Sequence, residues 1–439
     1  MRRLIPVLFI LFNVLTFQRT LAQPLLTLDE AIRRAIAHNY DVRVADVSAQ
    51  IAAANNTAGN AGLIPTLGGV GSVSGQSSNS LLRSNSGDET RRTGALTETY
   101  SLGLAGNFTV FAGGRAYLVR SQLRKLDEIG ATAYKAQLQV TVSQTIQTYA
   151  SVVFNQQQLV ATDTAIALAF SRMELSRNKY EIGTSAKVDY LQGQVDYNAA
   201  KATRLNFEIT LSTARANLNA LMGEQAQLTY RVEDSLALDL GLSAADSAAI
   251  RGSNLSIASA AQTAELGRIQ ARTARTLRSP SVNLTLGYGY NYTTSQASQF
   301  QLNRGFGPNG GANITLPIFQ AGNIERQIRV ADLTAESNQL QLDRQITLIS
   351  AQYQSAWEGY RAAREDYALE QTSILAAREN LDIQKARFRV GLATTLEIEV
   401  AENSYVQALG RLYNAAYNVK VNETRVLELE NKLVTNTAK

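Results

Sequence analysis

Three stretches of the chain alternate between apolar and polar side chains. In residues 96–110 six of the eight even positions are large apolar residues and the odd positions are mostly polar, and residues 282–292 and 312–318 follow the same pattern. Strict alternation predicts strands with one apolar face and one polar face. A fourth strand is expected after Pro65. This stretch is glycine-rich, so we infer the strand mainly because the second half of the chain repeats the first and has a strand at the aligned position. The joining polar loops are expected at 74–94 and 293–311.

Each pair of strands is followed by a long segment of about 70 residues with almost no helix breakers. At about 1.5 Å per residue, helices of that length reach on the order of 100 Å. Gly183 and Gly391 are expected to end them, because a left-handed residue at a helix C-terminus favours glycine. A second helix of about 40 residues follows each glycine. In the last one, a coiled-coil seam is predicted at Tyr405, Leu409, Leu412, Ala416, Val419 and Val426.

The segments around these two glycines align with each other without gaps. Gly183 aligns with Gly391 and, upstream, Phe111 aligns with Phe319, so that each pair is 208 residues apart. Nearer the N-terminus the offset becomes 215, because a segment between Pro65 and Phe111 is seven residues longer in the first copy. A period this long predicts a tandem duplication of a unit of about 200 residues.

The repeat divides the chain into two similar halves. We expect a first repeat at 23–223, with a strand pair at 65–111 and a helix tip near residue 183. A linker at 224–245 precedes a second repeat at 246–434, with a strand pair at 280–319 and a tip near residue 391. Residues 435–439 are expected to form a disordered tail.

Residues 1–22 have the pattern of a secretory signal peptide. Arg2 and Arg3 precede an apolar run, and small residues up to Ala22 suit cleavage before Gln23. The run has about 14 residues, too few for a membrane-spanning helix of about 20. The first mature helix is expected to start at a capping box formed by Thr27 and Glu30. It is expected to run to about residue 62.

Charge and cysteine content exclude several functions. Removing residues 1–22 takes away three arginines, so the net charge falls from +5 to 39 − 37 = +2. This small value supports no inference of nucleic-acid binding. The chain has no cysteine, so it has no disulfide framework and no thiol chemistry.

The mature chain also lacks an apolar run long enough for a membrane-spanning helix. If it enters a membrane, it must do so as a β-barrel, the other fold that satisfies its backbone in lipid. Four strands cannot close a barrel, since the smallest have about eight. An oligomer is therefore required. Two chains would give eight strands and three would give twelve, and the number of strands per chain does not distinguish a dimer from a trimer. The positions expected to face lipid are Tyr100, Leu102, Leu104, Leu284, Leu286 and Leu316.

Candidate catalytic chemistry is sparse. The single histidine, His38, lacks neighbouring groups for an acid–base pair or a metal site. The glycine-rich stretches are not followed by a Lys-Ser or Lys-Thr pair and a helix, so a phosphate loop is not indicated. Arg268, Arg272, Arg275 and Arg278 form a helical stripe, which we interpret as a solvated helix end rather than a lipid-headgroup contact. We expect no enzyme activity and no cofactor.

In order and spacing, these features resemble the TolC-like outer-membrane efflux proteins. The motifs are "LTLDEAIRRAIAHNYDV" (26–42), "LPIFQAGN" (316–323), and the tips "EIGTSAKVDYL" (181–191) and "RVGLATTLEIE" (389–399). The chain departs from the family at Tyr40, where proline is usual, and at Thr109, which stands opposite Pro317. Neither departure threatens the fold.

The resemblance implies a mixed α and β membrane protein in the outer membrane of a Gram-negative bacterium. It implies a homotrimer with a twelve-stranded transmembrane β-barrel, four strands per chain, that continues into a periplasmic barrel of coiled helices. It also implies a periplasmic adaptor (membrane fusion) protein and an energised inner-membrane transporter, of the resistance-nodulation-division, ATP-binding cassette or a similar class. The protein would be the passive channel of a tripartite efflux or type I secretion system.

By resemblance, the tips meet the adaptor's helical hairpin. The alternative is that the tip residues only fold the turn. The residues concerned are Ile182, Gly183, Thr184 and Ser185 on the first tip, and Val390, Gly391, Leu392 and Ala393 on the second.

The resemblance also suggests a gate. In the family's best-known member, an acid on the first tip is bound by a tyrosine and an arginine on the second. The acid survives here as Asp189, but the partners become Phe388 and Ala393, so that lock cannot form. A swapped lock would use the tyrosine of the first tip and the acid of the second. The gate residues are therefore expected to be Asp189, Glu397, Tyr180 and Lys187.

The same member carries two aspartates that form acidic rings in the pore. The matching positions here are Glu397 and Val400. Three-fold symmetry would place three Glu397 carboxylates near one axis, where like charges repel and a divalent cation would be held. The alternative is that Glu397 is a solvated helix residue. No firm metal site is expected.

Two other classes of protein share part of the pattern. A general porin would share the barrel and leave about 300 residues of helix unexplained. A secreted coiled-coil structural protein would share the helices and leave the alternating strands unexplained. The sequence leaves the cargo and the class of pump open, because a tunnel lining is chemically generic.

Overall fold

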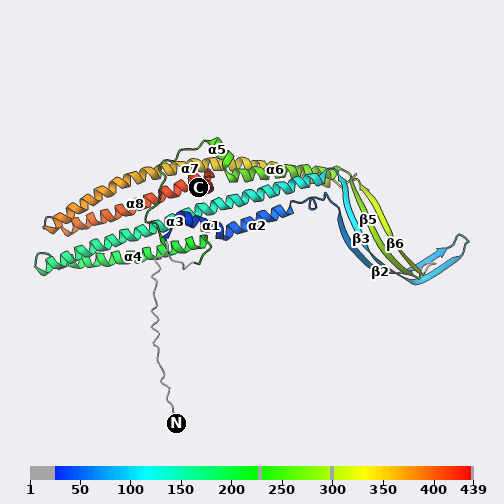
Figure 1. Cartoon of the computed structure of the whole chain (residues 1–439), viewed down its shortest axis with the longest axis horizontal. Helices are drawn as coiled ribbons and strands as arrows, with labels where there is room; N and C mark the ends of the chain where they lie inside the picture. The colour runs from blue at the N-terminus through cyan, green and yellow to red at the C-terminus, as the bar shows by residue number, and fades with distance from the viewer. Residues whose placement is uncertain (1–24, 226–229, 297–300, 437–439) are drawn as a thin grey trace, which may run out of the picture. The chain divides into compact units, whose positions relative to one another are not determined.

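The computed structural model describes residues 25–225, 230–296 and 301–436 (Figure 1). The expected signal peptide lies outside these residues, and so do the last three residues of the expected tail. Helix α9 (Leu433–Asn436) covers the start of that tail. Within the described ranges, no helix is both long and apolar enough to cross a membrane.

The described residues form two compact units, each assembled from segments that are far apart in the sequence. The first, the tip unit, takes the described residues of 1–37, 145–238 and 366–420. The second, the sheet unit, takes those of 38–144, 239–365 and 421–439.

The sheet unit contains an antiparallel sheet of four strands in the order β2-β3-β5-β6. The strands are β2 (Thr66–Arg83), β3 (Glu89–Ala112), β5 (Ser281–Ser295) and β6 (Leu302–Thr315). Strands β3 and β5 lie where the alternation predicted them, and β2 follows Pro65 as the repeat predicted. Strand β6 begins at Leu302, so the described part of the loop expected at 293–311 is largely strand. The expected loop at 74–94 is mostly strand, because β2 and β3 keep pairing as far as Arg83 and Glu89. Backbone hydrogen bonds hold this hairpin, and they need no apolar side chains.

The strand register sorts the side chains onto two different faces. Leu102 lies opposite Tyr290 and Leu104 opposite Tyr288, so the even positions of β3 and β5 share one face. Five of the six residues expected to face lipid belong to it: Tyr100, Leu102, Leu104, Leu284 and Leu286. The other face carries hydrogen-bonded polar pairs between neighbouring strands, namely Ser72–Ser101, Thr97–Ser295 and Thr109–Asn283. The sheet therefore has one apolar and one polar face, as predicted.

The sixth expected position, Leu316, is not in a strand. The prediction that this strand runs to residue 318 is wrong, because β6 ends at Thr315. Pro317 gives the reason, since proline has no N–H for a strand ladder and restricts the backbone of the residue before it.

Two pairs of long helices have matching lengths. Helices α3 (Arg115–Glu181) and α7 (Asn323–Arg389) have 67 residues each, and α4 (Lys187–Leu221) and α8 (Thr395–Leu429) have 35 each. Gly183 and Gly391 follow the long helices with φ angles of +78° and +79°. The prediction that these glycines end the long helices is confirmed.

The first mature helix is broken in two. Helix α1 (Leu28–His38) and helix α2 (Tyr40–Asn55) are separated by Asn39, whose backbone is extended. The Asn39 side chain accepts hydrogen bonds from the N–H groups of Asp41 and Val42 and so caps α2. The prediction of one continuous helix is wrong, because this asparagine is an N-cap.

The aligned residue in the second half, Asn254, makes the same break. It separates α5 (Ser247–Ser253) from α6 (Leu255–Arg275), and its side chain accepts from the N–H groups of Ser256 and Ile257. A short 3₁₀ helix, η1 (Thr276–Arg278), then leads to the sheet.

The core of the tip unit surrounds a two-stranded parallel sheet. Strand β1 (Leu25–Leu26) pairs with β4 (Arg231–Val232), which lies in the expected linker. The Tyr149 hydroxyl donates to the Leu26 carbonyl at 2.9 Å, and burial raises the pKa of Tyr149 to about 12. The apolar residues buried around it include Ala31, Val152, Val153, Leu211, Leu218 and Met222.

Candidate functional site at the helix tips

The turns that join α3 to α4 and α7 to α8 present apolar side chains to solvent. Ile182, Val390 and Leu392 are each 70% exposed or more. A side chain added at Gly183 or Gly391 would meet no atom within 4 Å, so the surface around both glycines is open. The tips therefore offer an exposed apolar surface where docking residues were predicted.

Hydrogen bonds fix the shape of the first tip. The Thr184 N–H donates to the Lys179 carbonyl at 2.8 Å, and the Gly183 N–H donates to the Tyr180 carbonyl at 2.9 Å. This pair is the Schellman arrangement, which needs a left-handed residue at the glycine position. A side chain at this position strains the backbone even though the space is free.

Both predicted gate acids lie in the first turn of a helix. Asp189 accepts a hydrogen bond from the Ser185 hydroxyl. Glu397 and Thr394 form a reciprocal capping box, in which Glu397 accepts from the Thr394 N–H at 2.6 Å and donates its own N–H to the Thr394 hydroxyl. These bonds from Thr394 lower the pKa of Glu397, with the Arg387 guanidinium as a smaller cause. In the single chain, Glu397 is thus an exposed carboxylate that caps α8.

The structure does not bring the swapped lock together within one chain. In the described part of the tip unit, no hydrogen bond joins the Tyr180 hydroxyl to Glu397. The Tyr180 side chain is 41% exposed, and Lys187 opens helix α4.

A different contact joins the two tips. The Lys179 ammonium lies 3.9 Å from the centre of the Phe388 ring and donates to the Phe388 carbonyl at 3.0 Å. Cation–π attraction and the hydrogen bond act together, and both involve the last turn of a long helix. Sequence reasoning treated Phe388 only as a lost tyrosine and overlooked Lys179.

Below the tips, an apolar cluster holds the two hairpins together. It is formed by residues from α3, α7 and α8, and Ala393 of the second tip packs against it. Its buried members are Leu168, Leu381, Phe388, Ile398 and Ala401.

One arginine is buried among acids beside this cluster. Arg172 of α3 is only 5% exposed, and its Nη2 donates to Asp196 of α4 at 2.8 Å. Its Nη1 lies 3.0 Å from Glu399 and its Nε lies 3.2 Å from Glu402, both on α8. Only the Asp196 contact has hydrogen-bond geometry, so the two α8 contacts are electrostatic. A single guanidinium thus links three helices of the tip unit.

Burial dominates the ionisation of Glu402. It raises the pKa of Glu402, and the Arg172 charge opposes this rise without cancelling it. A cavity of about 480 Å³ adjoins the four charged residues and is walled elsewhere by alanines, Leu168, Phe207 and Val406. The sequence held no signal for this cluster, because its members lie up to 230 residues apart (402 − 172).

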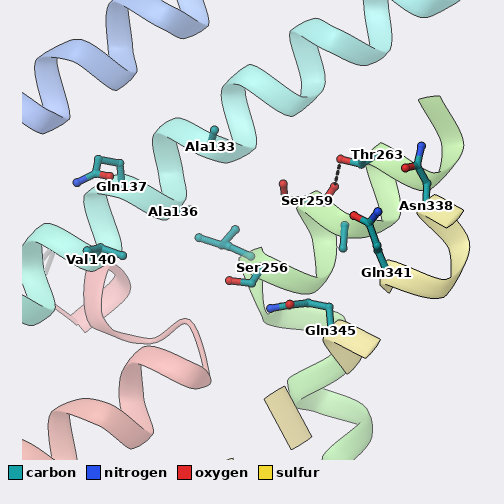
Figure 2. A pocket seen from close by; sticks show the side chains of 12 residues that line it. Ala133, Ala136, Gln137, Val140, Ser256, Ser259, Thr263, Asn338, Gln341 and Gln345 are labelled. Atoms are coloured by element: carbon teal, nitrogen blue, oxygen red, sulfur yellow. Dashed lines mark hydrogen bonds between the residues drawn. The ribbon is translucent and has the colours of Figure 1, made fainter. Parts of the chain in front are cut away.

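A second cavity, of about 460 Å³, lies in the sheet unit and differs in character. Its side chains come from α3, α6 and α7, and none of them is charged. Figure 2 shows the amides of Gln137, Asn338, Gln341 and Gln345 at its edge, with the Thr263 hydroxyl bonded back to its own helix. This cavity offers hydrogen bonds and no acid–base pair.

In the described ranges, no group of three or more histidine, cysteine, aspartate or glutamate side chains is arranged to hold a metal ion. The chemistry available at the tips is therefore that of exposed apolar contacts, helix caps and buried charge pairs. Such groups hold helices in place and bind other helices.

The sequence matches the family model "Outer membrane efflux protein" twice, over residues 31–224 and 248–431. These matches take in most of the chain, which therefore belongs to the family of outer membrane efflux proteins. The predicted resemblance and the outer-membrane location are thereby confirmed. The family is one of channel proteins rather than enzymes.

Two curated relatives are both named outer membrane protein TolC. The one from Salmonella enteritidis is 22% identical over 306 residues, covering 67% of this chain and 61% of its own length. The one from Escherichia coli (strain K12) is 22% identical over 308 residues, covering 67% and 62%. The chain thus spans about three fifths of the length of these relatives.

Solved structures agree with this fold. The outer-membrane channel OprN superposes with a TM-score of 0.79 at 17% identity and covers 92% of this chain and 90% of its own. The CmeC outer membrane channel of Campylobacter jejuni gives 0.76 at 18% identity, with 94% and 89% covered. At these identities the likeness shows the fold.

Proposed function

We propose that this protein is the outer-membrane channel of a tripartite efflux or type I secretion system. Three copies would each contribute β2, β3, β5 and β6 to a closed barrel of twelve strands. The long helices would continue as a tunnel through the periplasm. The channel itself would be passive, and the energy for transport would come from its inner-membrane partner.

The observation that carries this proposal is the open sheet. It has one apolar face, one polar face and two outer strands, β2 and β6, whose free edges have no partner strand among the described residues. Unpaired backbone groups in lipid cost several kcal/mol each, so the edges must pair with other copies. Family membership favours three copies.

Exposed apolar stripes on the helices support the same assembly. On α4 they follow coiled-coil spacing, with side chains 46% to 67% exposed at Val188, Leu191, Val195, Leu205 and Ile209. On α7 the exposed Leu369 and Ile383 lie two heptads apart, and Val390 follows one heptad later, just beyond the end of the helix. Stripes of this kind are coiled-coil seams that need a partner helix. In the proposed trimer that partner comes from a neighbouring copy.

The proposed partners are a periplasmic adaptor and an inner-membrane transporter. The exposed tips around Gly183 and Gly391 are the proposed adaptor-docking surface, with Ile182, Val390 and Leu392 as its apolar contacts. Asp189, Glu397, Tyr180 and Lys187 remain the proposed gate, acting between copies. A ring of Glu397 carboxylates from three copies is the proposed site for a divalent cation.

The domain organisation is part of the proposal. Two repeats, 23–223 and 246–434, would derive from a duplication and be joined by the 224–245 linker. Support comes from the twofold match of one family model, the equal helix lengths and the matching asparagine caps.

The test is purification from membranes followed by electrical recording. The proposal expects a detergent-extracted trimer that dissociates on heating and conducts as single channels in planar bilayers. A general porin would conduct without regard to changes at the tips, and a secreted coiled-coil protein would be extracted without detergent. A monomer or dimer, or a trimer without conductance, would contradict the proposal.

A further inference from the structure

Two large apolar side chains stand almost fully in solvent at the junction between β6 and α7. Ile318 is 91% exposed and Phe319 is 85% exposed, the highest values for large apolar residues in the described chain. Exposed apolar groups of this size are unusual when adjacent, and such patches mark a partner surface.

The backbone explains why these residues leave the sheet. In the first half of the chain, Phe111 aligns with Phe319 but stays in β3, where it lies opposite Val282. Pro317 replaces Thr109 in the second half, and β6 ends at Thr315, five residues earlier in the alignment than β3, which ends at Ala112. The chain then turns at Ala321 and Gly322, both with positive φ, before α7 begins.

The exposed pair continues the apolar face of the sheet. Ile314 lies on that face opposite Val282 and is 70% exposed. Leu316 and Ile318 extend the same alternation beyond the strand end. The surface is therefore continuous with the face proposed to meet lipid.

Aromatic side chains gather toward the other end of this face, at Tyr288, Tyr290, Tyr292 and Phe306. Tyr290 lies opposite Phe306, and from this pair to the Ser281–Thr315 pair at the strand end there are nine residues (315 − 306). At about 3.4 Å per residue this is about 31 Å along the strand. With a tilt of about 40°, the height is about 24 Å, close to the apolar band of about 25 Å that aromatic girdles flank in outer-membrane barrels.

Ion-paired side chains lie next to the exposed pair. Arg278 is ion-paired with Glu325, and both line the same surface hollow as Ile318 and Phe319. Arg275 is paired with Asp332, about two turns further along α7 than Glu325. Apolar residues beside paired charges fit the boundary between headgroups and acyl chains better than the centre of a bilayer.

We propose that Ile318 and Phe319 form a membrane-interface anchor that inserts among the phospholipid headgroups on the side of the barrel from which the helices leave. The anchor rests on the proposed barrel function. Tyr117, which is 75% exposed in the first turn of α3, belongs to the same membrane-interface anchor.

The test places a single tryptophan at each position to be probed. The chain has one tryptophan, Trp357 in α7, so Trp357→Phe gives a background without it. In that background, Phe319→Trp and Leu286→Trp are purified as full chains and reconstituted in vesicles of brominated phosphatidylcholine. Bromines near the headgroup end of the acyl chains should lower Phe319→Trp emission about twofold, and bromines near the chain end should lower it less, since interfacial groups sit about 5–10 Å deep. Leu286→Trp should show the reverse order, and the unmodified chain with Trp357 should not respond.

Each result has one meaning. Quenching of Leu286→Trp without quenching of Phe319→Trp overturns the anchor and leaves the proposed barrel intact, as expected if a second copy covers Phe319. Quenching of neither variant overturns the lipid-facing sheet itself. If Phe319→Trp does not fold, Ile318→Trp takes its place with the same expectations.

Discussion

Replacing Arg172 by methionine removes the only positive charge in direct contact with three carboxylates. Breaking a buried ion pair on one side costs about 3–5 kcal/mol, because the remaining charge is left uncompensated. The Asp196 and Glu399 side chains are 21% and 27% exposed, so water can solvate these carboxylates in place of part of the lost contact with the Arg172 guanidinium. The Glu402 side chain is only 8% exposed. We therefore expect a loss near the lower limit, about 3 kcal/mol at neutral pH.

The loss should depend on pH in a defined direction. The Arg172 charge now opposes the rise in the pKa of Glu402 that burial causes, so its removal raises that pKa further. A carboxyl whose pKa is higher in the folded state destabilises the fold when it is ionised and not when it is protonated. The loss in the variant should thus be largest above the raised pKa and should shrink as the pH falls through it.

Urea-induced unfolding in detergent, followed by far-ultraviolet circular dichroism, measures both effects. The matched control is Arg177→Met on the same helix, because Arg177 pairs with Glu181 in the open, at 51% and 54% exposure. Exposed pairs of this kind contribute about 0.5 kcal/mol or less. Adding Glu402→Gln to the Arg172→Met variant should restore part of the loss. Equal losses for the two arginines, or a loss that is constant from about pH 8 to pH 5, would refute the reasoning.

The sheet, the tips and the pore each give one more prediction. Leu286→Arg should impair membrane insertion, since charge on the lipid face costs about 2–4 kcal/mol at mid-membrane, whereas Thr285→Arg should be tolerated; equal insertion in a membrane-fractionation assay would reverse the assigned faces. Gly183→Arg or Gly391→Arg should abolish export while trimers persist on gels, and normal export would exclude the tips as the docking surface. Divalent cations on the periplasmic side should reduce conductance and Glu397→Gln should relieve this block in bilayer recordings; a block that persists in the variant would exclude the ring.

Much of the fold follows from local patterns. Alternation located three of the four strands and the polarity of their faces, and Gly183 and Gly391 located the helix ends, because these signals depend on a few neighbouring residues. The glycine-rich strand after Pro65 was found mainly through the internal repeat. The break between α1 and α2 at Asn39 was not predicted, and the reason is also local. An asparagine inside a helical pattern is an N-cap only if its own backbone is extended, and the sequence around Asn39 was helical on both sides.

The tip contacts could not be predicted in this way. Arg172 meets acids from two other helices, and Lys179 reaches a phenylalanine 209 residues away. Such contacts depend on how hairpins pack, which no window of the sequence contains. Conversely, Glu397 looked like a pore residue by alignment, and its capping box with Thr394 was visible in "TTLE" but not considered.

The hairpin of β2 and β3 reaches past its neighbours. The ladder between β3 and β5 ends at the Thr97–Ser295 pair, and Gln296 still contacts Leu96 and Arg92. Among the described residues, the strands from there to the turn near Gly87 pair as β2 with β3 (Figure 1). Nothing in the core depends on the length of this ribbon. Residues can be gained or lost at its end without shifting the register at its base, whereas one residue added within the paired sheet would turn every side chain beyond it to the opposite face. In evolution, this is where the chain is free to change its length and its outermost sequence while the channel below it stays the same.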